Sequence, residues 1–274
     1  MTRTRRSSEH TGSRLLIGLA LAGSIALTLG SAGSALAQQR TLASCPQPFS
    51  LYDNTHYSDV NLEGYGAIKS NILYEDAASA RAIAVGRVPD QTRFAINVAE
   101  HDQYPGPLVL DFEDLYLTGS PAIAAYHLQV LTLLARWAHH AAPGKIIGFY
   151  GLLDHTDRSY LALARELVPL EDAFFPSLYT FNDSRSQWSE RLQHDLWVAR
   201  EIAPGMPVYP YIWPQYHQGT PRALEYLAAR YWLFQLRAIR AYATGAVIRS
   251  SNGSNGSDQW VAATATFMNS LGRC

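Results

Sequence analysis

Short apolar runs alternate along this chain with longer segments in which apolar residues recur every three or four positions. The short runs predict β-strands, and the wider spacing predicts amphipathic helices. Residues 89–101 are less clear, but the alternation of apolar Phe94, Ile96 and Val98 favours a strand. The predicted strands are 49–52, 68–73, 89–101, 108–112, 145–150, 174–179, 207–211 and 246–248, and the predicted helices are 76–85, 121–143, 156–168, 184–202, 220–242 and 259–270.

This order of elements predicts a parallel α/β fold. Six or seven strand–helix units favour a (β/α) TIM-type barrel over a doubly wound sheet. The barrel can have fewer regular strands than the usual eight. The sequence has no glycine-rich phosphate loop of either common type, which disfavours nucleotide binding. We therefore expect one barrel domain over residues 38–274.

Residues 1–37 have the features of an export signal. Arginines within positions 3–6 precede an apolar run at 15–29, and the Ala-Leu-Ala of 35–37 fits a cleavage site. The apolar run is shorter than the roughly 20 residues that span a bilayer, although an uncleaved anchor is an alternative. We expect a secreted or periplasmic protein without stable membrane association after cleavage.

The two cysteines, Cys45 and Cys274, lie near the two ends of the expected mature chain. In an exported protein this placement predicts a disulfide that joins the ends of the domain. Two free thiols are the alternative, because chain ends need not lie within bridging distance.

Composition and charge narrow the range of partners. A chain that is 47% hydrophobic with a net charge of −1 suits a sizeable core and gives no attraction to nucleic acid. The nine histidines are scattered and form no metal-ligand pattern. We expect a monomer without metal or cofactor.

The clearest candidate chemistry follows the apolar run at 108–110, which leads directly into Asp111 and Glu113, with Asp114 beside them. On a strand, residues two apart share a face, which places these Cα atoms roughly 7 Å apart. Like charges in a partly desolvated site raise one carboxyl pKa, so that this group can act as a general acid. The pattern indicates glycosidase chemistry, although a solvated acidic turn is the structural alternative.

In a barrel, the active site lies where strands end at their carboxyl face. Aromatic rings at these ends offer flat surfaces on which sugar rings stack, and tyrosine hydroxyls add polar contacts. The candidates for substrate binding are Tyr116, Tyr150, Tyr179, Tyr211, Trp213 and Asn252 of the polar segment 249–252, with Tyr52 and Asp53 as weaker additions.

These residues resemble the hyaluronidase-type glycoside hydrolases, which are (β/α) barrels, in four short segments that occur in the family's order. Segment 110–116 is similar to the family's Asp-Trp-Glu-x-Trp strand, 147–154 to Trp-Gly-Tyr-Tyr…Pro-Asp, 175–179 to Pro-Ser-Ile-Tyr, and 207–214 to a strand ending Tyr-Thr-Arg-Pro.

The resemblance implies substrate-assisted hydrolysis of a β-linked N-acetylhexosamine in a glycan, with retention of configuration. Glu113 would donate a proton to the leaving oxygen, and Asp111 would orient the acetamido group, whose carbonyl oxygen is the nucleophile. Tyr179 and Tyr211 would brace that group. The spacing of Asp111 and Glu113 agrees with this mechanism. Two carboxylates this close on one strand are badly placed to flank a glycosidic bond as nucleophile and acid.

The sequence departs from the family at several positions. Phe112 and Leu115 replace tryptophans, Trp213 stands where the family has an arginine, and the segment 247–252 lacks the family's tryptophan. Loss of the arginine removes a carboxylate partner and argues against a uronic-acid substrate.

Two alternatives remain. A muramidase-like barrel glycosidase needs an additional carboxylate opposite Glu113, for which Asp53 and Asp183 are the candidates. A carbohydrate-binding protein that keeps the groove with little catalysis would account for the lost tryptophans.

Overall fold

The computed structural model describes residues 48–78, 83, 86–251 and 253–271. Residues Cys45–Cys274 form one compact unit. The predicted signal segment 1–37, the predicted disulfide partners Cys45 and Cys274, and the predicted site residue Asn252 fall outside the described residues. No helix in the described part of the chain is long and apolar enough to cross a membrane.

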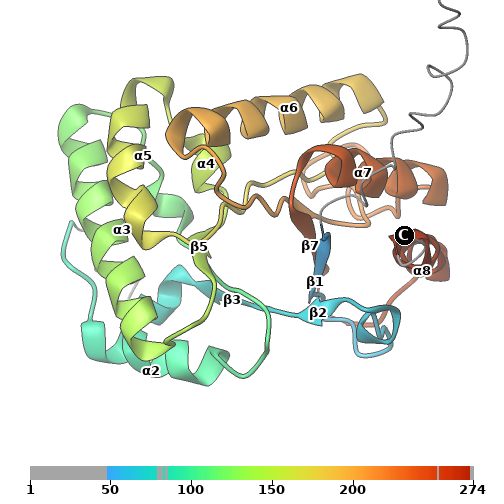
Figure 1. The fold of residues 1–274 in the computed structure, drawn as a ribbon, viewed down its shortest axis with the longest axis horizontal. Helices are drawn as coiled ribbons and strands as arrows, with labels where there is room; N and C mark the ends of the chain where they lie inside the picture. Colours follow the sequence, from blue (N-terminus) through green and yellow to red (C-terminus); the bar gives the residue numbers. More distant parts are fainter. Residues whose placement is uncertain (1–47, 79–82, 84–85, 252, 272–274) are drawn as a thin grey trace, which may run out of the picture. The chain divides into compact units, whose positions relative to one another are not determined.

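The strands alternate with helices along the chain and pair in parallel, which confirms the α/β prediction (Figure 1). They form a four-stranded sheet in the order β2-β1-β7-β6 and a three-stranded sheet in the order β3-β4-β5. Their bounds are β1 Ser50–Asn54, β2 Ile68–Lys69, β3 Asn71–Tyr74, β4 Leu108–Asp111, β5 Ile147–Phe149, β6 Tyr211–Ile212 and β7 Gly245–Arg249.

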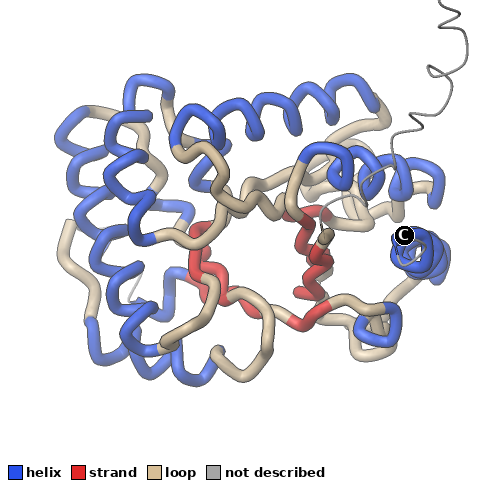
Figure 2. Tube along the Cα trace, viewed as in Figure 1, coloured by secondary structure: helices blue, strands red, loops and turns tan. Residues whose placement is uncertain are grey.

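The two sheets are connected on both sides. At Ser70 the chain passes from β2 directly into β3, so one extended stretch pairs with both sheets. On the other side, single bridges join Phe175 to the residue after β5 and Ser177 to Tyr211. Pro176 lies between them and cannot donate a backbone hydrogen bond, so the predicted strand 174–179 is present only as isolated bridges. Loops therefore connect the strand groups there (Figure 2).

Successive residues of the strands contribute to two different clusters, as expected for alternating side chains. In β4, Leu108 and Leu110 pack in a large cluster that contains many helix residues, whereas Val109 belongs to a smaller one. We call the smaller one the inner cluster; it consists of Tyr52, Ile72, Val109, Tyr150, Ala173, Phe175, Tyr179, Tyr209, Tyr211, Trp213 and Val247. Its members come from the strands and the strand-like segments between them, so they pack against one another on the face away from the helices.

The helices lie outside the strands (Figure 1). Two begin as predicted, because the Ser120 and Ser184 hydroxyls accept the backbone N–H groups of Ile123 and Gln187 as N-caps. The α-helices are α2 Gln91–His101, α3 Pro121–Ala141, α4 Leu152–His155, α5 Leu161–Leu167, α6 Arg185–Ile202, α7 Ala229–Tyr242 and α8 Asp258–Leu271. Short 3-10 helices are η1 Glu63–Tyr65, η2 Glu75–Ala78, η3 Glu113–Leu115, η4 Arg158–Tyr160 and η5 Val168–Leu170.

The predicted strand at 89–101 is wrong, since α2 occupies this segment. Asp90 caps the helix by accepting the backbone N–H of Arg93 at 3.0 Å. Phe94 and Val98, four residues apart, are fully buried, whereas Ile96 is 55% exposed. Buried residues four apart are typical of a helix, so this segment is helical although its apolar residues alternate.

The predicted helix at 220–242 begins nine residues late, at Ala229. Before it, the chain turns back on itself, because Gln215 pairs antiparallel with Tyr226. Leu224 adopts a positive φ of 65°, which a right-handed helix does not allow. A turn that returns along Gln215 therefore replaces the first part of the predicted helix.

Gly245 of β7 pairs with Ser50 of β1 and leaves no room for a side chain. A Cβ there would lie 2.0 Å from the backbone oxygen of Ser50. We expect Gly245→Ala to lower the free energy of unfolding by about 3 kcal/mol, because the strands must separate to admit the methyl group. Urea unfolding measures the loss, with Gly64→Ala as control, whose Cβ would meet only the Asn61 side chain at 3.4 Å. Equal stability of the two variants would contradict the pairing.

Glu171 makes stability depend on pH. It is 7% exposed and accepts the Phe149 backbone N–H at 3.4 Å. Burial raises its pKa to about 8, so the folded protein keeps a proton that the unfolded chain releases near the ordinary value of 4.5. Stability contributed by this group is therefore lost as pH rises from about 4.5 to about 8.

The free energy of unfolding is expected to fall between pH 5 and pH 9 in wild type, because Glu171 becomes charged while buried. We expect this fall to be a few kcal/mol smaller in Glu171→Gln, because glutamine carries no charge to bury. Chemical unfolding at both pH values measures this difference. The exposed Glu166→Gln is the matched control. A wild-type slope in Glu171→Gln would show that this carboxyl does not retain its proton.

Candidate active site

Asp111 is the last residue of β4 and lies two positions after Val109 of the inner cluster. It is 7% exposed, and its Oδ1 has no hydrogen-bond partner among the described residues. Burial and the nearby charges of Glu113 and Glu75 raise its pKa to about 7, while the charge of Arg249 acts in the opposite direction. Asp111 is thus a buried carboxyl that titrates near neutral pH.

Glu113 follows at the start of η3 and is exposed to solvent. The strand ends at Asp111, so the predicted pair on one continuous strand is corrected to one residue on β4 and one on the turn after it. Leu115 anchors this turn because it is fully buried. Glu113 makes no ion pair with the residues that the structure describes, so none of their cations occupies its carboxyl.

Three predicted tyrosines lie together beside Asp111. The ring of Tyr150 lies 5.1 Å from that of Tyr211 and 6.1 Å from that of Tyr179. The Tyr150 hydroxyl donates to Ser177 Oγ at 3.0 Å, whereas the buried Tyr211 hydroxyl has no partner in the described part of the chain. Burial raises the pKa of Tyr179 to about 12 and that of Tyr211 well above its ordinary value, so both are hydroxyl donors at neutral pH.

Tyr116 and Trp213 border this group. The Tyr116 ring stacks on His155 at 4.5 Å, and its buried hydroxyl has no partner among the described residues. Burial and then the charges of Glu113 and Asp111 raise the pKa of Tyr116, which places this hydroxyl close to both acids. Trp213 packs edge-on against Tyr179 and donates Nε1 to Gln215 at 3.0 Å. Trp213 is only 3% exposed, so most of its ring is covered by protein.

Side chains hold the irregular segment that carries Tyr179. Arg191 of α6 donates to the carbonyl oxygens of Tyr179 and Ser177 at 2.7 and 2.8 Å. Asp154 of α4 accepts the Ser177 backbone N–H at 3.0 Å. These bonds add to the backbone hydrogen bonds between this segment and its neighbours, such as that from Leu178 N–H to the oxygen of Tyr211 at 2.9 Å, and so fix the position of Tyr179.

Two further residues of the site follow strands. Glu75 comes directly after β3, whose last residue pairs with Asp111, and its pKa is raised by burial, Asp114 and Glu113. Sequence reasoning missed Glu75, although its position after the predicted strand 68–73 is the same signal that selected Asp111. Arg249, predicted only as part of a polar segment, ends β7, and its Nη1 lies 3.4 Å from the Tyr179 hydroxyl.

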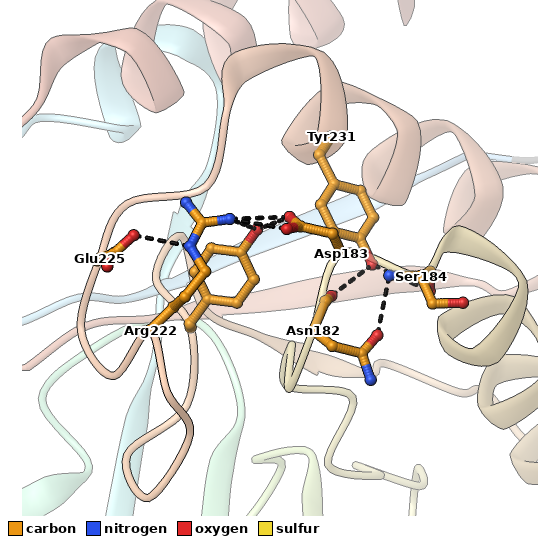
Figure 3. A network of polar contacts seen from close by, with 7 residues as sticks. Asn182, Asp183, Ser184, Arg222, Glu225 and Tyr231 are labelled. Carbon is orange, nitrogen blue, oxygen red and sulfur yellow. Dashed lines mark hydrogen bonds and ion pairs between the residues drawn. The ribbon is translucent and has the colours of Figure 1, made fainter.

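The carboxylates considered for a muramidase-like site are engaged elsewhere. Asp53 is 1% exposed and accepts Lys69 Nζ at 3.0 Å. Asp183 is exposed and accepts both a bidentate contact from Arg222 and the hydroxyl of Tyr216, while Arg222 also contacts Glu225 (Figure 3). The structure therefore assigns neither as the partner of Glu113.

Two cavities of about 620 and 660 Å³ lie away from these residues. The lining of the first includes Ser50, Val208 and Thr244 near the amino ends of strands, and that of the second includes Asp183 and Arg222. Of the candidate residues, Asp111 and Arg249 end their strands and Tyr150 and Trp213 directly follow theirs, whereas Tyr211 begins β6. The chemistry of the strand ends, rather than cavity size, identifies the candidate site.

Comparison with solved structures shows the fold. Bee venom hyaluronidase superposes with a TM-score of 0.57 at 17% identity, over 82% of this chain and 97% of that one. The same enzyme in complex with a hyaluronic acid tetramer gives 0.57 at 16% identity, over 82% and 96%. A GH18 chitinase from Pseudoalteromonas aurantia gives 0.50 at 14% identity, over 75% and 78%. No family model and no curated protein matches the sequence. The chain therefore has an α/β fold like that of these barrel glycosidases.

Proposed function

We propose that this protein is a glycoside hydrolase that cleaves a β-linked N-acetylhexosamine in a glycan outside the cytoplasm, with Glu113 as proton donor. The acetamido group of the substrate is the nucleophile, and Asp111 orients it. The fold shared with barrel glycosidases supports this proposal, and so does the chemistry at the ends of β4, β5 and β6.

One observation carries the proposal: two buried groups beside each other lack partners in the described residues. Asp111 Oδ1 is an acceptor, and the Tyr211 hydroxyl is a donor. Tyr150 connects them, because its backbone N–H donates to the oxygen of Leu110, next to Asp111, at 2.9 Å and its ring centre lies 5.1 Å from that of Tyr211. Buried polar groups normally have partners. An acetamido group offers one N–H donor and one carbonyl acceptor, and so satisfies both.

The steps follow from these positions. Glu113 gives its proton to the glycosidic oxygen as the bond to C1 breaks, and the acetamido oxygen attacks C1 from the other face. Positive charge develops on the resulting bicyclic oxazolinium ion, and the ionised Asp111 stabilises it through the N–H. Glu113 then removes a proton from the water that opens the ring, and the product retains the β configuration.

The experiment that tests the proposal measures new reducing ends after incubation with hyaluronan, chondroitin, chitin oligomers and peptidoglycan. Wild type is expected to release product from at least one polymer. Glu113→Gln, purified in parallel, excludes a contaminating hydrolase if its release is abolished. Binding to one polymer without release from any would favour the carbohydrate-binding alternative and overturn the proposal.

Glu75 supports a second candidate, a barrel glycosidase that uses two enzyme carboxylates. Its charge contributes to the raised pKa of Asp111, and that of Glu113 contributes to its own, so the three acids lie near one another. In the substrate-assisted mechanism Glu75 has no chemical step, and we expect Glu75→Gln to lower kcat less than about 10-fold. A loss as large as that of Glu113→Gln would favour the two-carboxylate mechanism, since removing a nucleophile or base abolishes its step.

A further inference from the structure

The charges around the strand ends are separated into two groups. Glu75, Asp111 and Glu113 follow the neighbouring strands β3 and β4. Lys69 and Arg249 end β2 and β7, which flank β1 on its two sides. Because Asp53 of β1 pairs with Lys69, a substrate bound between the two groups meets acids on one side and Arg249 on the other.

Arg249 is the cation of this group that has no carboxylate partner in the described part of the chain. Lys69 is neutralised by Asp53 at 3.0 Å. The nearest polar contact of Arg249 is the Tyr179 hydroxyl at 3.4 Å, and its buried Nε has no hydrogen-bond partner among the described residues. An arginine fork of this kind is suited to a planar carboxylate.

Two aromatic rings hold the guanidinium of Arg249 in place. Its guanidinium carbon lies 5.8 Å from the Trp213 ring centre and 5.9 Å from that of Tyr179, so two aromatic faces limit its movement. Partial burial lowers the pKa of His56, and the charges of Arg249 and Lys69 lower it further, whereas that of Asp53 raises it.

We infer that Arg249 binds an acidic group carried by the N-acetylhexosamine unit itself. This inference rests on the proposed function, which places the acetamido group of that unit against Asp111 and Tyr211. Arg249 contacts Tyr179 of the same subsite, so the acidic group belongs to the same sugar and not to the next one along the chain.

The order of the sugar carbons indicates where the acidic group is attached. The acetamido group is on C2, and C1 and C3 flank that carbon. Glu113 must face the oxygen on C1, and it lies on the same side of the site as the other acidic residues, Glu75 and Asp111. Arg249 ends β7 in the other sheet and reaches the subsite from there, so we assign it to C3. A 3-O-lactyl ether, as in muramic acid, carries its carboxylate at this position, whereas chitin is neutral and hyaluronan carries its carboxylate on the neighbouring uronic acid.

The test compares three chains that differ in this group: peptide-free peptidoglycan glycan, the same glycan with its lactyl carboxylates methyl-esterified, and chitin oligomers. We expect wild type to cleave the free acid with a kcat/KM about 10- to 100-fold above the other two. Arg249→Met is expected to remove this preference. Arg249→Lys is expected to keep part of it, because the charge remains while the planar fork is lost.

The ratio between substrates is the readout, because loss of the Arg249 charge also raises the pKa of Asp111 and changes the rate on every chain. Arg136→Met, at an exposed position of α3, is the matched control. Equal kcat/KM on the free acid and its ester would overturn the inference. A selective effect of Arg249→Met on hyaluronan would overturn it as well, since the acid would then lie on the neighbouring sugar.

A binding arm separates this inference from the proposed function. Titration calorimetry of the acidic glycan into Glu113→Gln needs no turnover. Adding Arg249→Met to that variant is expected to weaken binding of the free acid at least about 10-fold and binding of the ester less than about 3-fold. If no chain is cleaved but this difference is found, the proposed function fails and the acid site stands. If chains are cleaved and no difference is found, the inference fails alone.

Discussion

Glu113→Gln is expected to lower kcat by about 10²- to 10⁴-fold with little change in KM. General acid catalysis contributes this range, and glutamine has nearly the same shape but no proton to give. Glu113 is exposed, and no ion pair with it is present among the described residues, so the variant should unfold at the wild-type temperature. Steady-state kinetics on the polymer that wild type cleaves measures the loss.

The neighbouring Asp114 supplies the matched control. It is exposed on the same short helix as Glu113 and lacks a role in the proposed steps. Asp114→Asn is expected to keep kcat within about 3-fold of wild type. If Glu113→Gln retained as much activity as Asp114→Asn, the assignment of the acid would be wrong.

Asp111→Asn has the second large expected effect, a fall in kcat of about 10²- to 10³-fold. The amide keeps the size of the side chain but removes the negative charge that stabilises the oxazolinium ion, and lost electrostatic stabilisation of this kind has that magnitude. The fold should not suffer, because asparagine removes a carboxyl whose charged form is costly to bury. A kcat above one tenth of wild type would contradict the role of Asp111.

The same residue predicts a pH dependence. Burial, Glu113 and Glu75 raise the pKa of Asp111 to about 7. The carboxylate must be charged to stabilise the intermediate while Glu113 donates a proton, so kcat is expected to follow a bell-shaped profile whose acid limb reports the protonation of Asp111. A pH–rate profile of wild type tests this directly. A kcat that stays constant between pH 5 and pH 8 would show that the charge state of Asp111 does not limit the reaction.

Much of the fold could be predicted because local signals agreed with the tertiary structure. The apolar run 108–110 became β4, and the serine N-caps fixed the starts of α3 and α6. Two segments could not be assigned from local patterns alone. In α2, burial of Phe94 and Val98 against the core overrode an alternation that included the exposed Ile96. Before α7, the chain turns back and pairs with an earlier segment where the sequence predicted helix. Sequence periodicity carries no information on such pairing.

The site shows the same division. Asp111 and Tyr211 follow predicted strands, so the rule that active sites lie at the carboxyl ends of barrel strands selected them. Glu75 satisfied that rule too but lacked a second acid at the spacing that drew attention to Asp111. The separation of Arg249 from the acids depends on which strands are neighbours, and the order β7-β1-β2 is a property of the folded chain.

The configuration of the first product is the measurement that tests double displacement at C1, on which the proposed mechanism depends, most directly. A β-linked glycan that wild type cleaves is followed by proton NMR within the first minutes, before the free sugar equilibrates between its anomers. Attack by the acetamido group followed by water inverts C1 twice, so the account predicts that the β anomer appears first. The α anomer as first product would mean a single displacement by water and would contradict the assignment of the acetamido group as nucleophile.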